Sequence, residues 1–333
     1  MININYMTKK ISIVMATYNG DLYLSEQLDS IINQTYPLYE LIIQDDCSTD
    51  NTWNIINEYA SKYPKLIKKY QTKKNLGAHN NFKLAFQLAT GEYIAPSDQD
   101  DIWSLDKIEI LQSLIKDKDL SFSQEKILFE DGDEQATFEM MYPIEKLMWK
   151  NNLKGHTFLF KSSLLINYQN SGNLSFDYVL VLNACMRNSF VSIDQELSIW
   201  RRHSNVCTFA ILKNTSFKIE QISSWRKMWC CMFDLLKGEK SLAINQSFKD
   251  RSNVIGSFVG GDKKLKYISK LSKKISEQSF ISYVQAGLIN IFLLKYDKTF
   301  SVMSVRDMIG AIFFTFRMPY VYWFDMHNEK SLE

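Results

Sequence analysis

The sequence predicts an α/β fold in which a mostly parallel sheet is flanked by helices. Through the first hundred residues, short β-branched or apolar runs alternate with amphipathic segments, beginning with ISIVMA at 11–16. Buried parallel strands are continuous apolar runs, and each parallel connection needs a crossover, usually a helix. From about residue 210 the chain becomes rich in Lys, Phe, Trp and Met, and its apolar residues mostly recur at the spacing of an α-helix. We therefore predict an α/β domain followed by a mainly helical C-terminal extension.

The predicted elements follow one another regularly. Strands are predicted at 11–16, 41–43, 66–70 and 92–96, and helices at 22–32, 53–59, 78–89 and 105–115. Segment 117–150 is polar and mixed, and it shows no clear element. Beyond it we predict a strand at 156–160, a helix after Asp177 and a loop that carries residues 200–203.

The charge is unevenly distributed, although the whole chain has a net charge of only +2. Residues 1–204 hold 20 Lys and Arg against 26 Asp and Glu, whereas residues 205–333 hold 19 against 11. The acidic part is suited to holding a cation. The basic part is suited to an anionic surface such as lipid headgroups, or is a solvated lysine-rich helical face, and both interpretations stay open.

Cysteine usage and hydropathy limit the class of protein. The five cysteines are an odd number and contain no CxxC pair, which argues against a disulfide framework or a zinc site. The N-terminal ten residues have no apolar signal core, and no run of eighteen uncharged apolar residues occurs. These features predict a cytoplasmic protein.

Clustered carboxylates follow two of the predicted strands. In an open parallel sheet, ligands bind beyond the carboxyl ends of the strands. There the chain places TYNG at 17–20, DDCSTD at 45–50, NLG at 75–77 and SDQDD at 97–101. Because carboxylates repel one another, a hard divalent cation such as Mn²⁺ or Mg²⁺ is the expected partner of Asp98 and Asp100. The DDxST residues are also well suited to forming a turn and capping the next helix. Gly77 is expected to permit a tight turn, and Asn75 beside it could bind a nucleotide or close that turn.

Several other chemistries lack their sequence signatures. GxGxxG is absent after the first strand, which argues against a dinucleotide cofactor, and there is no GxxxxGK[ST] phosphate loop. The four histidines show no HExxH spacing, and no GxSxG elbow occurs.

Taken together and in order, these motifs resemble the inverting family 2 glycosyltransferases, and among them the bacterial polysaccharide-assembly enzymes of the rhamnosyltransferase-like kind. The resemblance is strongest over residues 10–115, from ISIVMATYNG to APSDQDDIW. It continues more weakly through GHTFLF at 155–160, FDY at 176–178 and WRRH at 200–203. The segment after Asp177 departs from the family, because Tyr178 is followed by Val179 and Leu180 instead of a bulky aromatic pair.

The resemblance implies a GT-A fold and a role for each matching residue. It implies a catalytic domain at 1–210, divided into a nucleotide-sugar-binding half at 1–116 and an acceptor half at 117–210. Residues 211–333 would be a helical region that associates with membrane or a partner. Asp177 would be the general base, and Asp98 and Asp100 the metal pair. The residues expected to bind the donor are Thr17, Tyr18, Asn19, Asp45, Asp46, Asn75, Gly77, Asp98, Arg201 and His203.

The expected function is transfer of a sugar, with inversion, from a UDP-, dTDP- or GDP-sugar to a hydroxyl of a glycan acceptor. The acceptor is expected to be lipid-linked, in bacterial surface polysaccharide synthesis such as capsule or O-antigen, with Mn²⁺ or Mg²⁺ as cofactor. A sugar nucleotidyltransferase and a non-catalytic GT-A scaffold are the alternatives. No nucleic-acid partner is expected, whereas peripheral binding to the inner face of the cell membrane and a homo-oligomer are both open.

Overall fold

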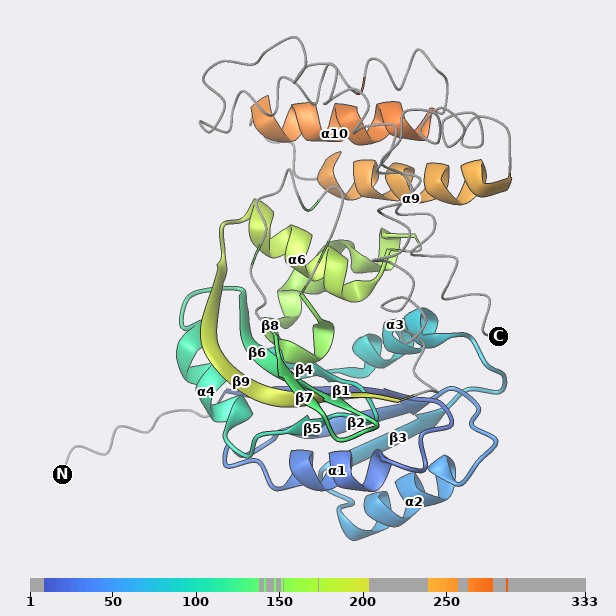
Figure 1. The fold of residues 1–333 in the computed structure, drawn as a ribbon, viewed down its shortest axis with the longest axis vertical. Helices are drawn as coiled ribbons and strands as arrows, with labels where there is room; N and C mark the ends of the chain where they lie inside the picture. Colours follow the sequence, from blue (N-terminus) through green and yellow to red (C-terminus); the bar gives the residue numbers. More distant parts are fainter. Residues whose placement is uncertain are drawn as a thin grey trace, which may run out of the picture. The chain divides into compact units, whose positions relative to one another are not determined.

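A computed structural model describes residues 9–137, 141, 147, 151, 153–172, 174–203, 239–256, 263–277 and 286. The chain divides into two compact units. The first contains Met1–Met141, Asn152–Gln169 and Ser175–Arg202, and the second contains Tyr142–Asn151, Asn170–Leu174 and His203–Glu333. Figure 1 shows the described elements in chain order.

The first unit is built on one sheet. Its described strands run in the order β3-β2-β1-β4-β8-β6-β9-β5, and β7 pairs with β6. Their bounds are β1 Ile11–Thr17, β2 Glu40–Asp45, β3 Ile67–Gln71, β4 Tyr93–Ser97, β5 Ile102–Trp103, β6 Leu120–Phe129, β7 Glu134–Ala136, β8 Phe158–Lys161 and β9 Phe190–Arg202. The four N-terminal strands are parallel to one another, as predicted. The other half is mixed, because β8 is antiparallel to both β4 and β6.

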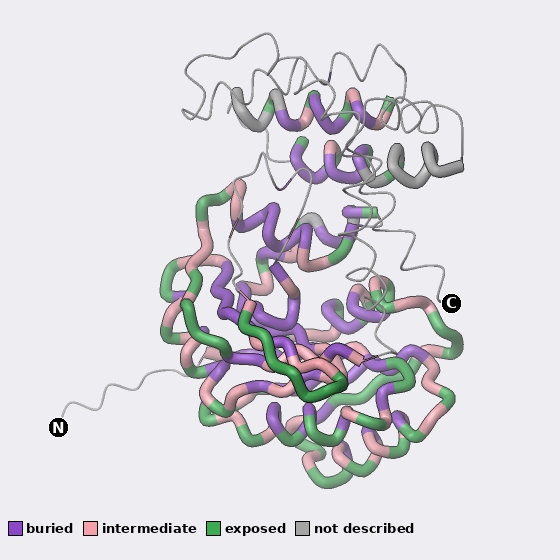
Figure 2. Tube along the Cα trace, in the orientation of Figure 1, coloured by how far each residue is buried: buried purple, intermediate pink, exposed green. Residues whose placement is uncertain are grey.

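Helices cover both faces of this sheet. They are α1 Leu24–Ile32, α2 Thr52–Lys62, α3 Ala78–Leu88, α4 Lys107–Ile115 and α6 Phe176–Met186, with 3₁₀ turns η1 Gly155–Thr157 and η2 Ser162–Asn170. Figure 1 shows α1 and α2 on one face, and α3 and α6 on the other. Alternate residues of β1 and β2 pack against α1, α2 and α4, and Phe82 and Phe86 of α3 contact Phe176 of α6. The strands β1, β2 and β4 are thus buried on both faces, as Figure 2 shows in purple, whereas β3 at the edge of the sheet is exposed beyond Ile67.

Two segments differ from the sequence-based prediction. Segment 117–150, which showed no clear element, contains strands, and most of the loop predicted at 200–203 belongs to a strand. β6 and β7 lie within 117–150, and the buried polar residues Ser121, Ser123 and Glu125 explain why β6 has no apolar pattern. The prediction of a loop at 200–203 was wrong for three of its four residues, because Trp200, Arg201 and Arg202 end β9. Pairing with β6 extends β9 this far, with Ile127 opposite Trp200 and Phe129 opposite Arg202.

The described part of the second unit contains two helices. They are α9 Glu239–Gly256 and α10 Lys263–Ser276, and Ser272 Oγ donates a hydrogen bond to the carbonyl of Phe248 at 2.6 Å. Ile268, Leu271 and Ile275 of α10 are buried, whereas the lysines at 266, 270 and 273 are exposed. The apolar and aromatic segments at 282–296 and 308–324 lie outside the described residues, apart from Ala286.

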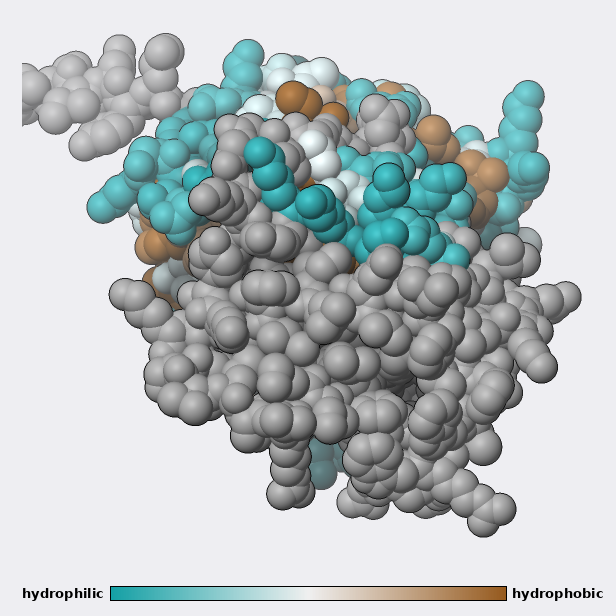
Figure 3. All heavy atoms as spheres, turned by 90° about the horizontal axis from the view of Figure 1, so that it is seen from above, coloured by the Kyte–Doolittle hydropathy of each residue, from teal (hydrophilic) through white to brown (hydrophobic). Residues whose placement is uncertain are grey.

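Among the described helices, none has the length and apolar character needed to cross a membrane. Figure 3 shows hydrophilic residues over much of the described surface on the face it displays, with hydrophobic residues in small groups between them.

Glu40 begins β2, at the amino ends of the parallel strands, and its hydrogen bonds hold neighbouring segments together there. Its buried carboxylate accepts hydrogen bonds from Ser12 Oγ at 2.6 Å, from the Thr90 amide at 2.7 Å and from Lys68 Nζ at 2.5 Å. Burial alone would raise the pKa of Glu40, but these hydrogen bonds, led by the one from Lys68, outweigh burial and lower it.

We expect Glu40→Gln to reduce the free energy of unfolding at pH 7 by about 1–3 kcal/mol, because four donors, the Thr90 hydroxyl among them, lose a charged acceptor. Since the folded-state pKa lies below the unfolded one, the carboxylate stabilises the fold above its unfolded pKa, and this contribution is lost as the pH falls through its folded pKa. Urea unfolding at pH 7 and pH 4, with Lys68→Met as a milder variant, measures this. Equal stability of Glu40→Gln and the unchanged protein at pH 7 would contradict it.

Candidate active site

The loops after β1, β2 and β4 meet at one edge of the parallel half of the sheet. β1 lies between β2 and β4, with Thr17 opposite Asp45 and Met15 opposite Ser97. Because the three strands are parallel and in register, their carboxyl ends reach the same edge. The carboxylates predicted to share a site are therefore brought to a common edge.

Asp45 holds the first two of these loops together. Its fully buried carboxylate accepts hydrogen bonds from Thr17 Oγ1 at 3.0 Å, from the amide and hydroxyl of Ser48 at 3.0 and 2.5 Å, and from Gln71 Nε2 at 2.9 Å. These donors occupy both carboxylate oxygens. Asp45 and Thr17 thus shape the floor of the site, which is the turn-forming role that DDxST also predicts.

Asp46 is buried beside the loop that precedes α3. It accepts hydrogen bonds from the amides of Leu76 at 2.9 Å and Gly77 at 2.8 Å, and from Thr72 Oγ1 at 3.1 Å. Gly77 has a φ of 82°, which a residue with a side chain rarely adopts, and its amide also donates to Asn75 Oδ1 at 2.9 Å. Gly77 permits the tight turn, as predicted, and Asn75 closes it.

Tyr18 and Asn19 connect the β1 loop to its two neighbours. Gln99 receives a hydrogen bond from the Tyr18 amide at 2.8 Å and donates one to the Tyr18 carbonyl at 3.0 Å. The Asn19 amide donates to Ser48 Oγ at 2.9 Å, and Asn19 Oδ1 accepts from the Thr49 amide at 2.9 Å. The Tyr18 side chain is 43% exposed, so it is available to a ligand at this edge.

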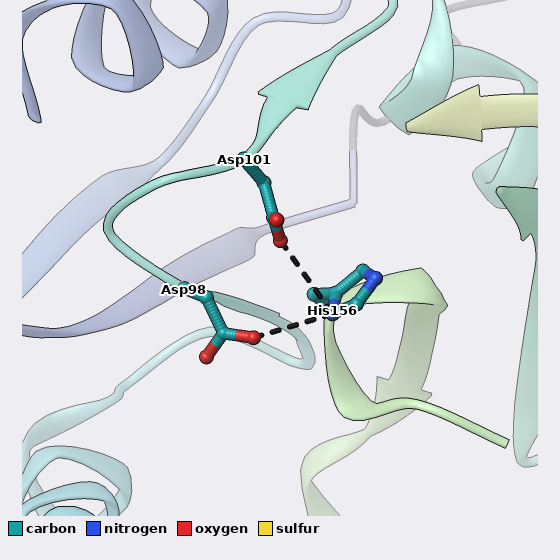
Figure 4. Close-up of side chains that lie close together, drawn as sticks. All are labelled: Asp98, Asp101 and His156. Atoms are coloured by element: carbon teal, nitrogen blue, oxygen red, sulfur yellow. Dashed lines mark hydrogen bonds and ion pairs between the residues drawn. The ribbon is translucent and has the colours of Figure 1, made fainter. Parts of the chain in front are cut away.

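A group of three potential metal ligands lies at the end of β4. Asp98 and Asp101 both approach Nδ1 of His156, at 3.2 and 3.5 Å (Figure 4). One ligand atom from each of the three residues lies within 4.8 Å of the other two. The Asp98 side chain is 44% exposed, whereas Asp101 and His156 are buried. Asp98 is thus the member of the group that solvent or a substrate can reach.

The Asp101 carboxylate is the strongest sign that a cation belongs here. Among the described residues, neither of its oxygens has a hydrogen-bond partner, although the side chain is fully buried. Burial raises its pKa well above the usual range, the charge of His156 opposes this, and Asp98 and Asp100 add to it. A buried carboxylate with unused oxygens next to a second carboxylate and an imidazole fits a divalent cation. Asp100 itself is partly buried and lies outside this group of three.

Buried charges of both signs surround His156. Its Nε2 contacts the Glu125 carboxylate, and its carbonyl accepts a hydrogen bond from Lys107 Nζ at 2.6 Å. Burial opposes protonation of His156, but Asp101 and Glu125 outweigh it and raise its pKa. Burial lowers the pKa of Lys107 to about 7 despite its acidic neighbours, and its ammonium lies 3.9 Å from the centroid of the Trp103 ring.

The two arginines at the end of β9 have different neighbours. Arg201 forms an ion pair with Glu26 of α1 and lies 4.9 Å over the ring of Tyr23. Arg202 is buried and stacks at 4.3 Å on Trp200. Burial lowers the pKa of Arg202, and the negative charges of Glu125 and Asp100 oppose this in part. His203, the residue after β9, belongs to the second unit.

Asp177 lies in the first turn of α6, the helix that was predicted to follow it. Its Oδ1 accepts a hydrogen bond from the Tyr178 amide at 2.6 Å. Burial raises its pKa, hydrogen bonds from Ser175 and Tyr178 oppose this, and the charges of Lys154 and Asp98 act on it in opposite directions. Phe176 fills the space that a side chain at Gly155 would need, because its ring carbon Cζ lies 2.2 Å from the point that a Cβ atom would occupy. The turn carrying His156 therefore packs directly against the turn carrying Asp177.

Sequence reasoning missed Asp101 as a ligand candidate, and it gave no role to Glu125, Lys107, His156 or Arg202, although His156 and Arg202 stand in the quoted GHTFLF and WRRH runs. Asp101 is the last residue of the quoted SDQDD run, but nothing in the sequence distinguishes it from an ordinary turn residue. The other four come from other segments of the chain, up to about 100 residues away, and nothing local marks them.

Comparison with known proteins identifies the family of this chain. Residues 12–167 match the model of the family "Glycosyl transferase family 2". The dTDP-rhamnosyl transferase RfbG of Shigella flexneri is 32% identical over 221 residues, covering 61% of this chain and 75% of that protein. The UDP-Glc:alpha-D-GlcNAc-diphosphoundecaprenol beta-1,3-glucosyltransferase WfgD of Escherichia coli is 36% identical over 112 residues, covering 34% of this chain and 43% of that protein.

Among solved structures, TarS 1-349 of S. aureus in complex with UDP-GlcNAc has a TM-score of 0.50 and 17% identity, covering 87% of this chain and 92% of that one. The fold is therefore that of the GT-A glycosyltransferases. The chain belongs to glycosyltransferase family 2. It spans 59% of the length of the first curated relatives it matches, which are uncharacterised proteins of Mycobacterium bovis and Mycobacterium tuberculosis.

Proposed function

We propose that this chain transfers a sugar from a nucleotide-diphosphate donor to a hydroxyl group of a glycan acceptor, with inversion at the anomeric carbon. The observation that carries the proposal is the group formed by Asp98, Asp101 and His156 at the carboxyl edge of the sheet, next to the turn that carries Asp177. A cation site beside a partly buried carboxylate supplies the two functions that a single-displacement transfer needs: leaving-group stabilisation and a base.

In this proposal the donor lies along the strand-end loops. Tyr18 and Asn19 are exposed at that edge and contact the base or ribose, together with Asn75 and Gly77. Thr17, Asp45 and Asp46 act mainly by fixing these loops, because their side chains are already hydrogen-bonded within the protein. Arg201 and His203 support the phosphates from the β9 side, and breaking the ion pair with Glu26 would release Arg201 for this role.

In this proposal Asp98 and Asp100 both act on one divalent cation, Mn²⁺ or Mg²⁺, at the diphosphate, Asp98 as a direct ligand and Asp100 through water. When bound, such a cation offsets the charge that develops on the departing diphosphate. Asp177 accepts the proton of the attacking acceptor hydroxyl as the new glycosidic bond forms on the opposite face of the sugar. The raised pKa of Asp177 makes it a better proton acceptor than an ordinary surface carboxyl group.

The acceptor is proposed to be a lipid-linked glycan in bacterial polysaccharide synthesis. The name of one relative, the glucosyltransferase WfgD, supports this, since it acts on a diphosphoundecaprenol-linked sugar. The exposed lysines of α10 support a peripheral position at the inner face of the membrane, in a helical region at 211–333 that follows a catalytic domain at 1–210.

A donor-hydrolysis screen tests the proposal. The protein is incubated with UDP-, dTDP- and GDP-sugars in Mn²⁺, Mg²⁺ or EDTA, and the released nucleotide is measured. Release from one donor, dependent on a metal ion, is the expected result. Absence of both binding and release for every donor would favour the non-catalytic scaffold, and synthesis of a nucleotide sugar from a sugar phosphate would favour the nucleotidyltransferase.

A further inference from the structure

The imidazole ring of His156 has a carboxylate facing each of its nitrogens. Asp98 and Asp101 face Nδ1 at 3.2 and 3.5 Å, while Glu125 contacts Nε2 from the opposite side. His156 and Glu125 are both buried, so water does not separate the pair. Among the described residues, these are the carboxylates within ion-pair distance of this ring.

Glu125 faces Nε2 of His156, on the other side of the ring from Asp98 and Asp101. Its Oε2 contacts that nitrogen, and its Oε1 lies 3.5 Å from Lys154 Nζ. An ionised carboxylate can only accept a hydrogen bond, and Nε2 of His156 is therefore the donor. This leaves Nδ1, on the side of Asp98 and Asp101, as the nitrogen that can exchange its proton for a metal ion.

The chain also fixes the ring in position. The carbonyl of His156 accepts the hydrogen bond from buried Lys107, and Lys154 Nζ lies 3.5 Å from Glu125. On its other side the turn packs against Phe176 through Gly155. A side chain held this firmly loses little conformational freedom when it binds an ion. Metal-ligating histidines are commonly held in this way, with a carboxylate at the nitrogen that does not bind the metal.

We propose that His156 is a nitrogen ligand of the divalent cation, alongside Asp98 and Asp101, and that Glu125 is the positioning residue that presents its Nδ1. The inference rests on the proposed function for the identity of the bound substrate, but not for the presence of the ion. Asp101, whose buried oxygens lack hydrogen-bond partners among the described residues, is the third ligand. Asp100 reaches the ion from the solvent side, through water.

A nitrogen ligand changes which cation the site prefers. Mg²⁺ favours oxygen ligands and gives up water reluctantly, whereas transition-metal ions accept imidazole readily. We therefore expect Mn²⁺ to bind more tightly than Mg²⁺, by about tenfold or more. The preference should shrink in His156→Asn, because the remaining ligands are carboxylates.

The direct test is pulsed electron paramagnetic resonance of Mn²⁺ bound to the full chain. Coupling of the Mn²⁺ electron spin to a histidine ¹⁴N nucleus is expected, and it should be lost in His156→Asn. If that variant fails to fold, the triple variant of His79, His203 and His327 to Gln isolates His156, and the coupling should persist in it. Bound Mn²⁺ without nitrogen coupling in the unchanged protein would overturn the inference.

The affinity for Mn²⁺ tests the role of Glu125. Glu125→Gln is expected to weaken Mn²⁺ binding by about 10–100-fold, because an amide does not fix the tautomer of His156. Glu134→Gln, an exposed carboxylate on the neighbouring β7, is the matched control and should leave the affinity unchanged. Equal affinities for Glu125→Gln and Glu134→Gln, with both variants folded, would remove Glu125 from the site.

The two proposals can fail separately. Metal-dependent donor release without nitrogen coupling would keep the glycosyltransferase activity and reject His156 as a ligand. Nitrogen coupling without release from any donor would keep the metal site and reject the proposed function.

Discussion

Asp177→Asn is expected to lower the rate of sugar transfer by about 10²–10⁴-fold while leaving the affinity for the donor nucleotide nearly unchanged. Asn has the same shape, and its carbonyl oxygen can still accept the hydrogen bond from the Tyr178 amide. It has no basic site at neutral pH, so the proton of the attacking hydroxyl has no acceptor. Steady-state transfer kinetics and calorimetric titration of the nucleotide separate the two effects.

The pH dependence of transfer gives a second check on Asp177. Because burial raises the pKa of this carboxyl group above its ordinary value of 3.8, the rate should fall with decreasing pH earlier than for an exposed aspartate. This acidic limb should be absent from the residual activity of Asp177→Asn. The exposed Asp117→Asn is the matched control, and a fully active Asp177→Asn would disprove the base assignment.

Asp98→Asn is expected to reduce metal-dependent release of nucleotide from the donor by about 10²–10³-fold, since stabilisation of the leaving group by a bound cation contributes several kcal/mol. Of the two carboxylates in the group of three, Asp98 has an exposed side chain and Asp101 a buried one, so Asp98 is the one that an ion shared with a substrate phosphate would meet. Its amide replacement can still accept a hydrogen bond from His156, which preserves the local fold. Activity is measured across a Mn²⁺ series.

Raising the Mn²⁺ concentration should restore part of the activity of Asp98→Asn if the defect lies in ion binding. Asp133→Asn, in the exposed turn between β6 and β7, carries the same chemical change away from the site and should behave like the unchanged protein. An Asp98→Asn protein with normal activity and normal metal dependence would contradict the assignment.

The parallel half of the fold is predictable from the sequence because its signals are local. Runs such as ISIVMA are buried on both faces of a sheet, and their length and β-branched content identify them without tertiary information. The same is true of Gly77, whose positive φ agrees with the predicted tight turn. Asp98 could be found because a strand end in a parallel sheet is a ligand-binding position whatever the rest of the fold.

The other half was not predictable for an equally physical reason. β6 carries Ser121, Ser123 and Glu125 in buried positions, and a strand with buried polar side chains has neither an apolar run nor an alternating pattern. Pairing between β6 and β9, which are about 70 residues apart in the chain, makes a strand of WRR. Because of this pairing, Arg201 and Arg202 occupy successive positions of one strand and have different neighbours, Glu26 for Arg201 and Trp200 for Arg202.

The environment of His156 shows the same limit at the level of the site. GHTFLF predicts a strand, and the structure forms one at Phe158–Lys161 after a short turn. The sequence does not show that the turn brings an imidazole between Glu125 of β6 and the loop after β4. Burial of Lys107 beneath the same turn is likewise a tertiary effect, since its position on α4 reads as an ordinary helical lysine.

Crystals grown or soaked with Mn²⁺ and, in turn, UDP or dTDP would test the central claim most directly, with data collected at the manganese absorption edge. The account predicts one strong anomalous peak among Asp98, Asp101 and His156, at about 2.1–2.3 Å from their ligand atoms. It also predicts nucleotide density along the β1 loop at Tyr18 and Asn19. A nucleotide bound away from the carboxyl edge of β1, β2 and β4, or an ion that does not touch Asp98, would contradict it.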